Sequence, residues 1–471
     1  MISPATTNPL FPPGPRQPKL SLPRLRLPGD RLGFLTRLKQ QYGDVVYFRM
    51  GFEDIYLVSD PELIREVLVT NHKNFLKGRG LERVKRLLGN GLLTSEKEFH
   101  LRQRRMMQPA FHRERIAGFA RQMVAEAEQT MAGWRDGQEL DIAHEMGLLT
   151  LRIVGKTLFG SDVDAMAVDV NHSITALMES FYLMMLPFPW LIERLPFPKL
   201  SRMRQARRRL DEIIYTLIDA RRKSISNGDA NAHGDDLLSM LLEAQDTEGD
   251  GGGMTNEQVR DEAMTIFIAG YETTANATAW TWYLLTQNPG TAQALHEEVD
   301  RVLQGRAPAA ADYPALSYTE KAVAESMRLY PPAWIVARRA INEQKLGDYI
   351  VKQRSLVMAS QWIMHRDPRY FPEPLRFDPL RWTHEFRASL PKYVYFPFGG
   401  GPRQCIGEGF AWMEAVLLIA AISQRWSMEL LPGQKIEPEP VVTLRPKNGI
   451  KVRLRSREKM TKSEVAKAAA S

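Results

Sequence analysis

Residues 398–407, Phe398-Gly-Gly-Gly401-Pro-Arg403-Gln-Cys405-Ile-Gly407, contain the single cysteine of this 471-residue chain. A cysteine thiolate donates electron density to a haem iron strongly enough to favour O–O cleavage. The glycines allow the backbone to approach a flat macrocycle closely, and Arg403 could clamp a haem carboxylate with paired hydrogen bonds. The apolar run Phe410 to Ile422 predicts a helix after the loop, and a helix N-terminus favours a thiolate.

Two other interpretations of this loop are weaker. A lone cysteine is more often a small buried side chain, and a triple glycine can form a phosphate loop, but no lysine follows in the required spacing. The pattern F-x-x-G-x-R-x-C-x-G resembles the haem-binding signature of the cytochrome P-450 superfamily. The resemblance implies that Cys405 ligates the iron of haem b. It also implies haem contacts from Pro397, Phe398, Gly399, Arg403, Ile406, Gly407 and Ala411.

A long helix is predicted in the middle of the chain. Thr255 and Gln258 form a capping box at its start, and Asn288-Pro289-Gly290 ends it after Gln287. Near its centre, the segment 269–274 (Ala-Gly-Tyr-Glu-Thr-Thr) contains a glycine and two threonines, which are poor helix formers. The threonine hydroxyls can bond to a backbone carbonyl and bend the helix. This segment resembles the oxygen-activation motif of the superfamily. The resemblance implies that Thr273 hydrogen-bonds oxygen, that Glu272 relays protons from solvent, and that Ala269 and Gly270 contact haem.

A third motif is E-x-x-R at Glu325 and Arg328, on a helix predicted from Ser317 to Tyr330. Spacing of three residues places both side chains on one helix face, and Ser317 with Glu320 predicts a second capping box. Such a pair alone is usually a surface ion pair. Its position before Cys405 resembles the superfamily's Glu-Arg-Arg cluster, which Arg376 would complete in a structural role.

Basic residues are the expected partners of two haem propionates, because buried carboxylates need compensating charge. By the resemblance, His100 and Arg104 in His100-Leu-Arg-Gln-Arg104 hold one propionate. Arg338 matches another propionate arginine, and Arg403 completes the set.

Substrate contacts rest on the resemblance and on apolar composition. The expected residues are Leu88, Phe181, Met185, Ile266, Ala269, Ile335, Val336 and Val442. The stretch 179–197 is rich in aromatic residues and methionine. Core packing is one explanation of this composition, and a lipophilic entrance, in contact with a membrane surface or apart from it, explains it equally well.

Composition excludes several classes of protein. One cysteine precludes an intrachain disulfide and fits a reducing cytosol. Nine scattered histidines offer no helical pair for zinc. The net charge of +8 lacks the aromatic-interleaved basic stripe of nucleic-acid binding, and its basic clusters are solvated faces or a docking surface for an acidic partner. No apolar run approaches the ~20 residues of a membrane span, so we expect a soluble, cytoplasmic protein without a transmembrane anchor.

The periodicity predicts a mostly α protein with small β-sheets, which is also the fold that the resemblance implies. We expect a Pro-rich segment at 1–20, a single domain at 21–455 and a polar flexible tail at 456–471. Alternation around Gly51 predicts a hairpin over 43–58.

The resemblance implies a haem-dependent monooxygenase that inserts one oxygen atom from O2 into a lipophilic substrate such as a fatty acid or terpenoid. No flavin or iron–sulfur module fits in the chain, so a ferredoxin or flavodoxin-type donor with its reductase must supply two electrons. One alternative is a peroxide-driven peroxygenase or isomerase on the same fold, whose members often lack the acid–threonine pair. The other is a non-catalytic haem- or lipid-binding protein, which needs no proton relay.

Overall fold

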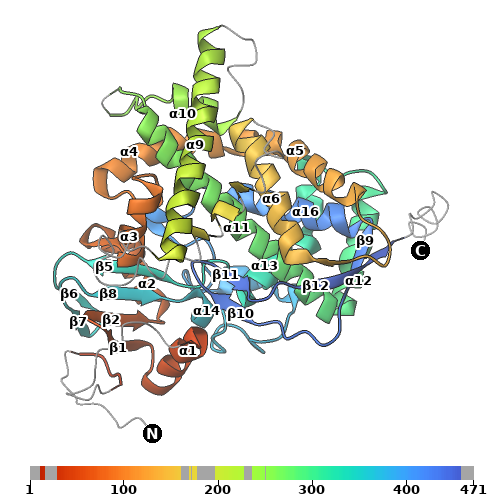
Figure 1. The fold of residues 1–471 in the computed structure, drawn as a ribbon. Coiled ribbons are helices and arrows are strands. Elements are labelled where there is room, and N and C mark those ends of the chain that lie inside the picture. Colours follow the sequence, from red (N-terminus) through yellow and green to blue (C-terminus); the bar gives the residue numbers. More distant parts are fainter. Residues whose placement is uncertain are drawn as a thin grey trace.

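The computed structural model describes residues 11–15, 29–160, 169–170, 172–174, 176–177, 197–227, 236–249 and 251–457. Helices fill most of the molecule, and the largest sheet lies at one end of it, at the lower left of Figure 1. The helices are α1 Arg31–Tyr42, α2 Pro61–Arg65, α3 Arg79–Leu88, α4 Lys97–Met107, α5 Arg113–Ala132, α6 Ile142–Phe159, α9 Pro198–Ser226, α10 Leu237–Glu243, α11 Asn256–Gln287, α12 Pro289–Leu303, α13 Ser317–Leu329, α14 Gln361–Met364, α15 His384–Ser389 and α16 Glu408–Ser423. The predicted fold class is therefore confirmed.

Within the described residues, the strands form one five-stranded sheet, in the order β1-β2-β8-β5-β3, and three smaller sheets, β4-β12-β9, β6-β7 and β10-β11. The strands are β1 Val45–Met50, β2 Glu53–Val58, β3 Phe75–Lys77, β4 Glu139–Asp141, β5 Val336–Ala340, β6 Gln344–Leu346, β7 Tyr349–Val351, β8 Leu356–Ala359, β9 Trp426–Leu430, β10 Pro438–Pro440, β11 Leu444–Pro446 and β12 Lys451–Ser456. The predicted hairpin is confirmed, because β1 and β2 pair antiparallel around Gly51 with Tyr47 opposite Tyr56.

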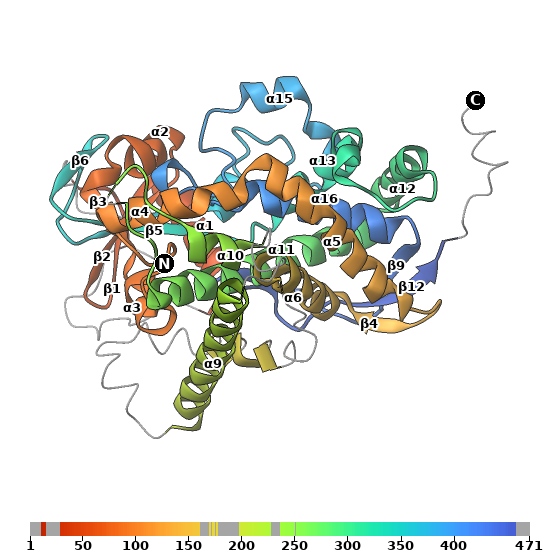
Figure 2. The same cartoon turned by 90° about the horizontal axis from the view of Figure 1, so that it is seen from above.

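Helix α11 is the central element of the helical part. Its capping box is present, with the Thr255 hydroxyl accepting from the Gln258 N–H and the Gln258 side chain accepting from the Thr255 N–H. It spans 32 residues and ends at Gln287, as predicted. Figure 2 shows α13 and α16 on one side of α11 and α6 on the other, and all three pack against it. This enclosure explains why most α11 side chains are buried although their pattern is not amphipathic.

The predicted capping box of α13 is wrong. The N-cap residue is Leu316, and Ser317 is already the first helical residue. The N-terminus is capped instead by Glu298 of α12, whose carboxylate accepts from the N–H groups of Tyr318 at 2.7 Å and Thr319 at 2.8 Å. A carboxylate also opposes the positive end of the helix dipole. A cap supplied by another helix leaves no local signature in the sequence.

Replacing Glu298 by alanine should lower the free energy of unfolding by about 2 kcal/mol. The buried N–H groups in the first turn of α13 would lose their charged acceptor. Urea unfolding followed by circular dichroism measures this. The neighbouring Glu297 is exposed and bonded only to Gln293 within its own helix, so Glu297→Ala should cost less than about 0.5 kcal/mol. Equal effects of the two changes would show that Glu298 does not cap α13.

Of the predicted terminal segments, the structure describes only residues 11–15 of 1–20 and residues 456 and 457 of 456–471.

The predicted helix at Phe410 to Ile422 is confirmed as α16, which is almost entirely buried. Because α16 starts immediately after the cysteine loop and packs against α11, it fixes that loop beside the central helix.

Candidate active site

A cavity of 390 Å³ lies between the cysteine loop, α11 and the strand β5. Most of the predicted site residues meet on its walls, although they come from segments far apart in the sequence. The predicted residues that line it are His100, Arg104, Ile266, Ala269, Gly270, Thr273, Ile335, Val336, Arg338, Pro397, Phe398, Gly399, Arg403, Cys405, Ile406, Gly407 and Ala411.

The cysteine loop has a backbone that requires glycine at two positions. Gly399 and Gly401 have φ of +73° and +68°, a region that residues with a β-carbon rarely adopt. A β-carbon on Gly401 would lie 2.0 Å from the Leu68 carbonyl oxygen, so the loop packs directly on the chain after α2. The loop is closed by a hydrogen bond from the Cys405 N–H to the Phe398 carbonyl at 3.0 Å.

Cys405 is surrounded by protein, yet its side chain is accessible from the cavity. Burial raises the pKa of the thiol to about 11, and a hydrogen bond from the Gly407 backbone opposes this shift. In the protein alone the thiol is therefore the favoured form. A bound cation at the sulfur would be needed to hold the thiolate at neutral pH.

Helix α11 contributes Ala269, Gly270 and the hydroxyl group of Thr273 to the wall of the same cavity. The Thr273 hydroxyl donates to the Ala269 carbonyl at 2.7 Å, as expected for a threonine in a weak part of a helix. Gly270 permits close packing of α6, since a β-carbon there would lie 3.1 Å from Val154. Glu272 does not line the cavity; its carboxylate accepts from the Thr443 hydroxyl at 2.8 Å, on another side of the helix.

One end of the cavity is strongly basic. His100, Arg104, Arg338 and Arg403 line it, and Lys77, which the sequence analysis missed, joins them. Burial and then the charge of Arg403 lower the pKa of Arg338 to about 10. Burial and the surrounding cations, Arg403 first, lower the pKa of His100 to about 2. Burial is the first cause of both shifts and the neighbouring positive charges are the second, while the Glu96 carboxylate pairs with Arg403 and offsets part of that charge.

Lys77 is a buried member of this cluster, with only 6% of its surface exposed. Its ammonium group donates to the carbonyls of Leu92 and Leu93, which also line the cavity. Burial lowers its pKa well below the usual range. Lys77 therefore ties the 92–93 segment to the basic end, and no local sequence motif indicates this role.

The predicted Glu-Arg-Arg cluster forms, but with a different second arginine. Glu325 and Arg328 are completely buried and paired through two hydrogen bonds of 2.8 Å. The third member is Arg381, whose Nε lies 3.0 Å from Glu325. The prediction for Arg376 is wrong, because its side chain is exposed and pairs with Glu373. Both arginines follow Pro-Leu and precede an aromatic residue, so the sequence pattern alone did not separate them.

Comparisons with known proteins agree with this arrangement. A family described as Cytochrome P450 matches residues 12–454. The chain belongs to the cytochrome P450 family. Cyclooctatin synthase of Streptomyces melanosporofaciens is 42% identical over 88% of this chain and 89% of that protein. Cyclooctat-9-en-7-ol 5-monooxygenase of the same organism is 36% identical over 85% and 86%, and pentalenene oxygenase of Streptomyces avermitilis is 33% identical over 90% and 93%.

Membership of the P450 family makes the chain a haem-thiolate monooxygenase, and the cavity fits such a cofactor. The accessible Cys405 sulfur faces the cavity. At the basic end Arg403 pairs with Glu96, but Arg104 and Arg338 form no ion pair within the described chain, and they match the two carboxylates of a haem. Among the described residues, no group of three or more His, Cys, Asp or Glu side chains is arranged to hold a metal ion. A single sulfur ligand to an iron carried by a macrocycle is consistent with this donor set.

Two predicted P450 substrate residues, Leu88 and Val442, are not part of the cavity wall. Leu88 is buried at the end of α3, where its carbonyl accepts from Arg260 at 3.1 Å. Val442 lies between β10 and β11 without reaching the cavity. Phe181 and Met185, with most of the stretch 179–197, lie outside the described residues. Among the residues that the structure describes, every helix is too short or too polar to span a bilayer.

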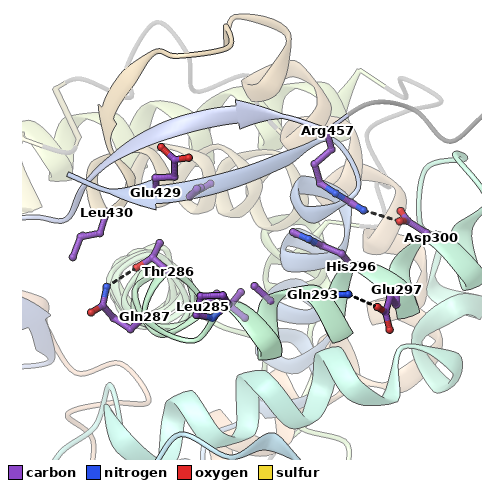
Figure 3. A pocket seen from close by; sticks show the side chains of 13 residues that line it. Leu285, Thr286, Gln287, Gln293, His296, Glu297, Asp300, Glu429, Leu430 and Arg457 are labelled. Carbon is purple, nitrogen blue, oxygen red and sulfur yellow. Dashed lines mark hydrogen bonds and ion pairs between the residues drawn. The ribbon is translucent and has the colours of Figure 1, made fainter. Parts of the chain in front are cut away.

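A second hollow of 620 Å³ shows that size alone does not identify the P450 site. It lies between the end of α11, α12 and β9, where Arg457 pairs with Asp300 at 2.6 Å (Figure 3). It shares no lining residue with the Cys405 cavity. Burial, together with Arg457, lowers the pKa of its one histidine, His296, to about 4. None of the predicted residues within the described chain lines it.

Proposed function

We propose that Cys405 is the axial ligand of haem b and that this enzyme inserts one oxygen atom from O2 into a lipophilic terpenoid. The observation that carries the proposal is a single cavity lined both by Cys405 and by Ala269, Gly270 and Thr273 of α11. When bound there, the haem iron supplies the activation of dioxygen for insertion into a C–H bond. His100, Arg104, Arg338 and Arg403 would hold its carboxylates, and Lys77 would hold the 92–93 segment beside them.

A terpenoid is the preferred substrate class for two reasons. The walls of the cavity away from the basic end are mainly aliphatic and aromatic, which suits a hydrocarbon skeleton. These walls include Leu81, Leu92, Leu93, Phe111, Ile266, Ile335 and Val336. In addition, two relatives are named for acting on cyclooctat-9-en-7-ol and on pentalenene. A fatty acid is the second candidate substrate. The basic end of the cavity would bind the carboxylate of a fatty acid only if the haem carboxylates left one of its cations unpaired.

A separate ferredoxin or flavodoxin-type protein, with its reductase, is the proposed electron donor. A surface hollow of 590 Å³ lies behind the cysteine loop and shares Pro397, Phe398, Gly399 and Gln404 with the inner cavity. The loop is therefore a thin wall between surface and cavity, which suits electron transfer toward Cys405. In the basic clusters at 102–105 and 207–209, Arg105 pairs with Asp246 and Arg209 pairs with Asp169, both at 2.9 Å, so part of their charge is used within the protein. A cytoplasmic location stays a prediction.

The first test is the difference spectrum of the reduced protein with and without carbon monoxide. A Soret band shifted far to the red supports thiolate ligation, and a band at the position of histidine-ligated haem contradicts it. Titration with pentalenene and with cyclooctat-9-en-7-ol then tests the substrate class through the spin-state change of the haem. Turnover driven by peroxide alone, and absent with a ferredoxin and its reductase, would favour the peroxygenase alternative.

Replacing Thr273 by alanine should lower the ratio of product formed to electrons consumed several-fold, because the cavity loses the hydroxyl that we assign to proton delivery. Product and reductant consumption are measured together with a ferredoxin and its reductase. Thr278 provides a matched control, since its buried hydroxyl bonds only within α11. Unchanged coupling in Thr273→Ala would remove the proposed role of Thr273.

A further inference from the structure

The carboxylate of Glu272 is held by a segment that no sequence motif connects with oxygen activation. Thr443, which lies between β10 and β11, donates its hydroxyl proton to Glu272 Oε1 at 2.8 Å. The same hydroxyl accepts from the side-chain amide of Asn276 at 3.1 Å. Because Asn276 can only donate here, the proton of the Thr443 hydroxyl is directed to Glu272. Thr443 is 7% exposed, so water does not easily replace this contact.

The two residues of the predicted acid–threonine pair therefore face different parts of the protein. Thr273 lines the cavity, whereas Glu272 points to the β10–β11 hairpin. A relay residue must take up a proton on one side and release it on the other. The observed contact corresponds to the uptake side, and a change of side-chain rotamer is the step that would turn the carboxyl group toward Thr273.

The β10–β11 hairpin carries charged, partly exposed side chains near Glu272. Arg445 of β11 pairs with Glu439 of β10 at 2.8 Å, and their side chains are 31% and 33% exposed. Burial raises the pKa of Glu272, while the hydrogen bond from Thr443 and the charge of Arg445 lower it. Tyr271 is the other titratable group near this carboxyl, and burial and then Glu272 raise its pKa to about 12. Tyr271 therefore stays neutral, and Arg445 is the charge that faces Glu272.

We propose that Thr443 is a positioning residue that holds Glu272 toward the β10–β11 hairpin, and that this hairpin is the solvent end of the proton route. Each cycle of the relay moves one proton: a hydronium ion at the hairpin protonates the Glu272 carboxylate and leaves a water molecule, and the carboxylic acid later gives its proton to the Thr273 side and becomes a carboxylate again. No electron is transferred in either step. The inference rests on the proposed function, because it assumes that Glu272 relays protons during oxygen activation.

The direct test is the titration of the Glu272 carboxyl group by infrared spectroscopy of the haem-loaded protein. The carboxylic acid stretch that disappears in Glu272→Gln identifies this group, and its amplitude is followed with pH. In Thr443→Val the midpoint should rise by about one pKa unit, because the carboxylate loses one hydrogen bond. Thr443→Ser keeps the hydroxyl and should restore the wild-type midpoint. Thr278→Val removes a comparable buried hydroxyl of α11 and should leave the midpoint unchanged.

Turnover provides the second readout. With pentalenene or cyclooctat-9-en-7-ol as probe, Thr443→Val should lower product per electron several-fold and raise the solvent deuterium isotope effect on kcat. KM should stay the same because Thr443 does not line the cavity. Thr443→Ser should rescue both quantities.

The inference is overturned if the infrared midpoint is the same in Thr443→Val and wild type, or if Thr443→Ser fails to rescue coupling. Failure of the proposed function looks different, because neither terpenoid would then bind or be oxidised by the wild-type enzyme. The infrared titration needs no turnover, so it still decides whether Thr443 sets the state of Glu272.

Discussion

Replacing Glu325 by alanine should cost about 3–5 kcal/mol of stability and abolish haem incorporation. The carboxylate is completely buried and accepts from Arg328, Arg381 and Trp382 at 2.8–3.0 Å. Removing one partner of a buried ion pair leaves the other charge uncompensated in a low dielectric, which gives this magnitude. Domains are typically stable by only about 5–15 kcal/mol. Urea unfolding and the haem-to-protein ratio measure both effects.

The effect should reach the cysteine loop because the cluster anchors the chain that precedes it. Arg328 donates to the carbonyls of His365 at 2.8 Å and Pro374 at 2.7 Å. His365 in turn accepts from the Phe396 N–H at 3.0 Å, immediately before Pro397. Burial and the charge of Arg328 lower the pKa of His365, so the ring is neutral and able to accept. Loss of Glu325 therefore loosens the support of the loop that carries Cys405.

Two arginine variants test whether Arg381 or Arg376 belongs to the buried cluster of Glu325. Arg381→Ala should destabilise the protein by about 2 kcal/mol, since Glu325 loses a charged donor. Arg376→Ala should change stability by less than about 0.5 kcal/mol, because its pair with Glu373 is exposed. If Arg376→Ala were the more damaging change, the assignment of Arg381 to the cluster would be wrong. If Glu325→Ala bound haem normally, the anchoring role itself would be wrong.

Features encoded in short segments were predictable from the sequence. The α11 capping box, the β1–β2 hairpin and the α16 helix each depend on residues within one or two turns of each other. The cysteine loop was predictable because glycine, arginine and cysteine stand at fixed spacing in ten residues. Such features form from residues that are close in the sequence, so a short segment is enough to predict them.

Features that depend on a distant partner were missed. Glu298 caps α13 from another helix, and Thr443 meets Glu272 across a sequence separation of 171 residues. Lys77 reaches the basic end from a strand that carries no motif. The choice between Arg376 and Arg381 is decided by which side chain the 372–382 turn directs inward, which the repeated Pro-Leu-Arg pattern leaves open. Tertiary contact, rather than residue type, selects the partner in each case.

Replacing Cys405 by serine should abolish the red-shifted Soret band of the carbon monoxide complex and reduce monooxygenase turnover below detection. A serine hydroxyl is a harder and far less electron-donating ligand than a thiolate, so it cannot favour O–O cleavage. The fold should tolerate the change, because the side chain is accessible from the cavity rather than packed in the core. Thermal unfolding of the apoprotein is the control for that statement.

Cys405→His distinguishes loss of the ligand from loss of the cofactor. An imidazole can still coordinate iron, and the basic end at Arg104, Arg338 and Arg403 is unchanged, so haem should remain bound. Its carbon monoxide complex should then absorb at the position of histidine-ligated haem, without turnover. A serine or histidine variant that kept both the red-shifted band and terpenoid oxidation would refute Cys405 as the axial ligand. Haem retention by Cys405→His with turnover lost would instead assign cofactor binding to the basic end and oxygen activation to the sulfur.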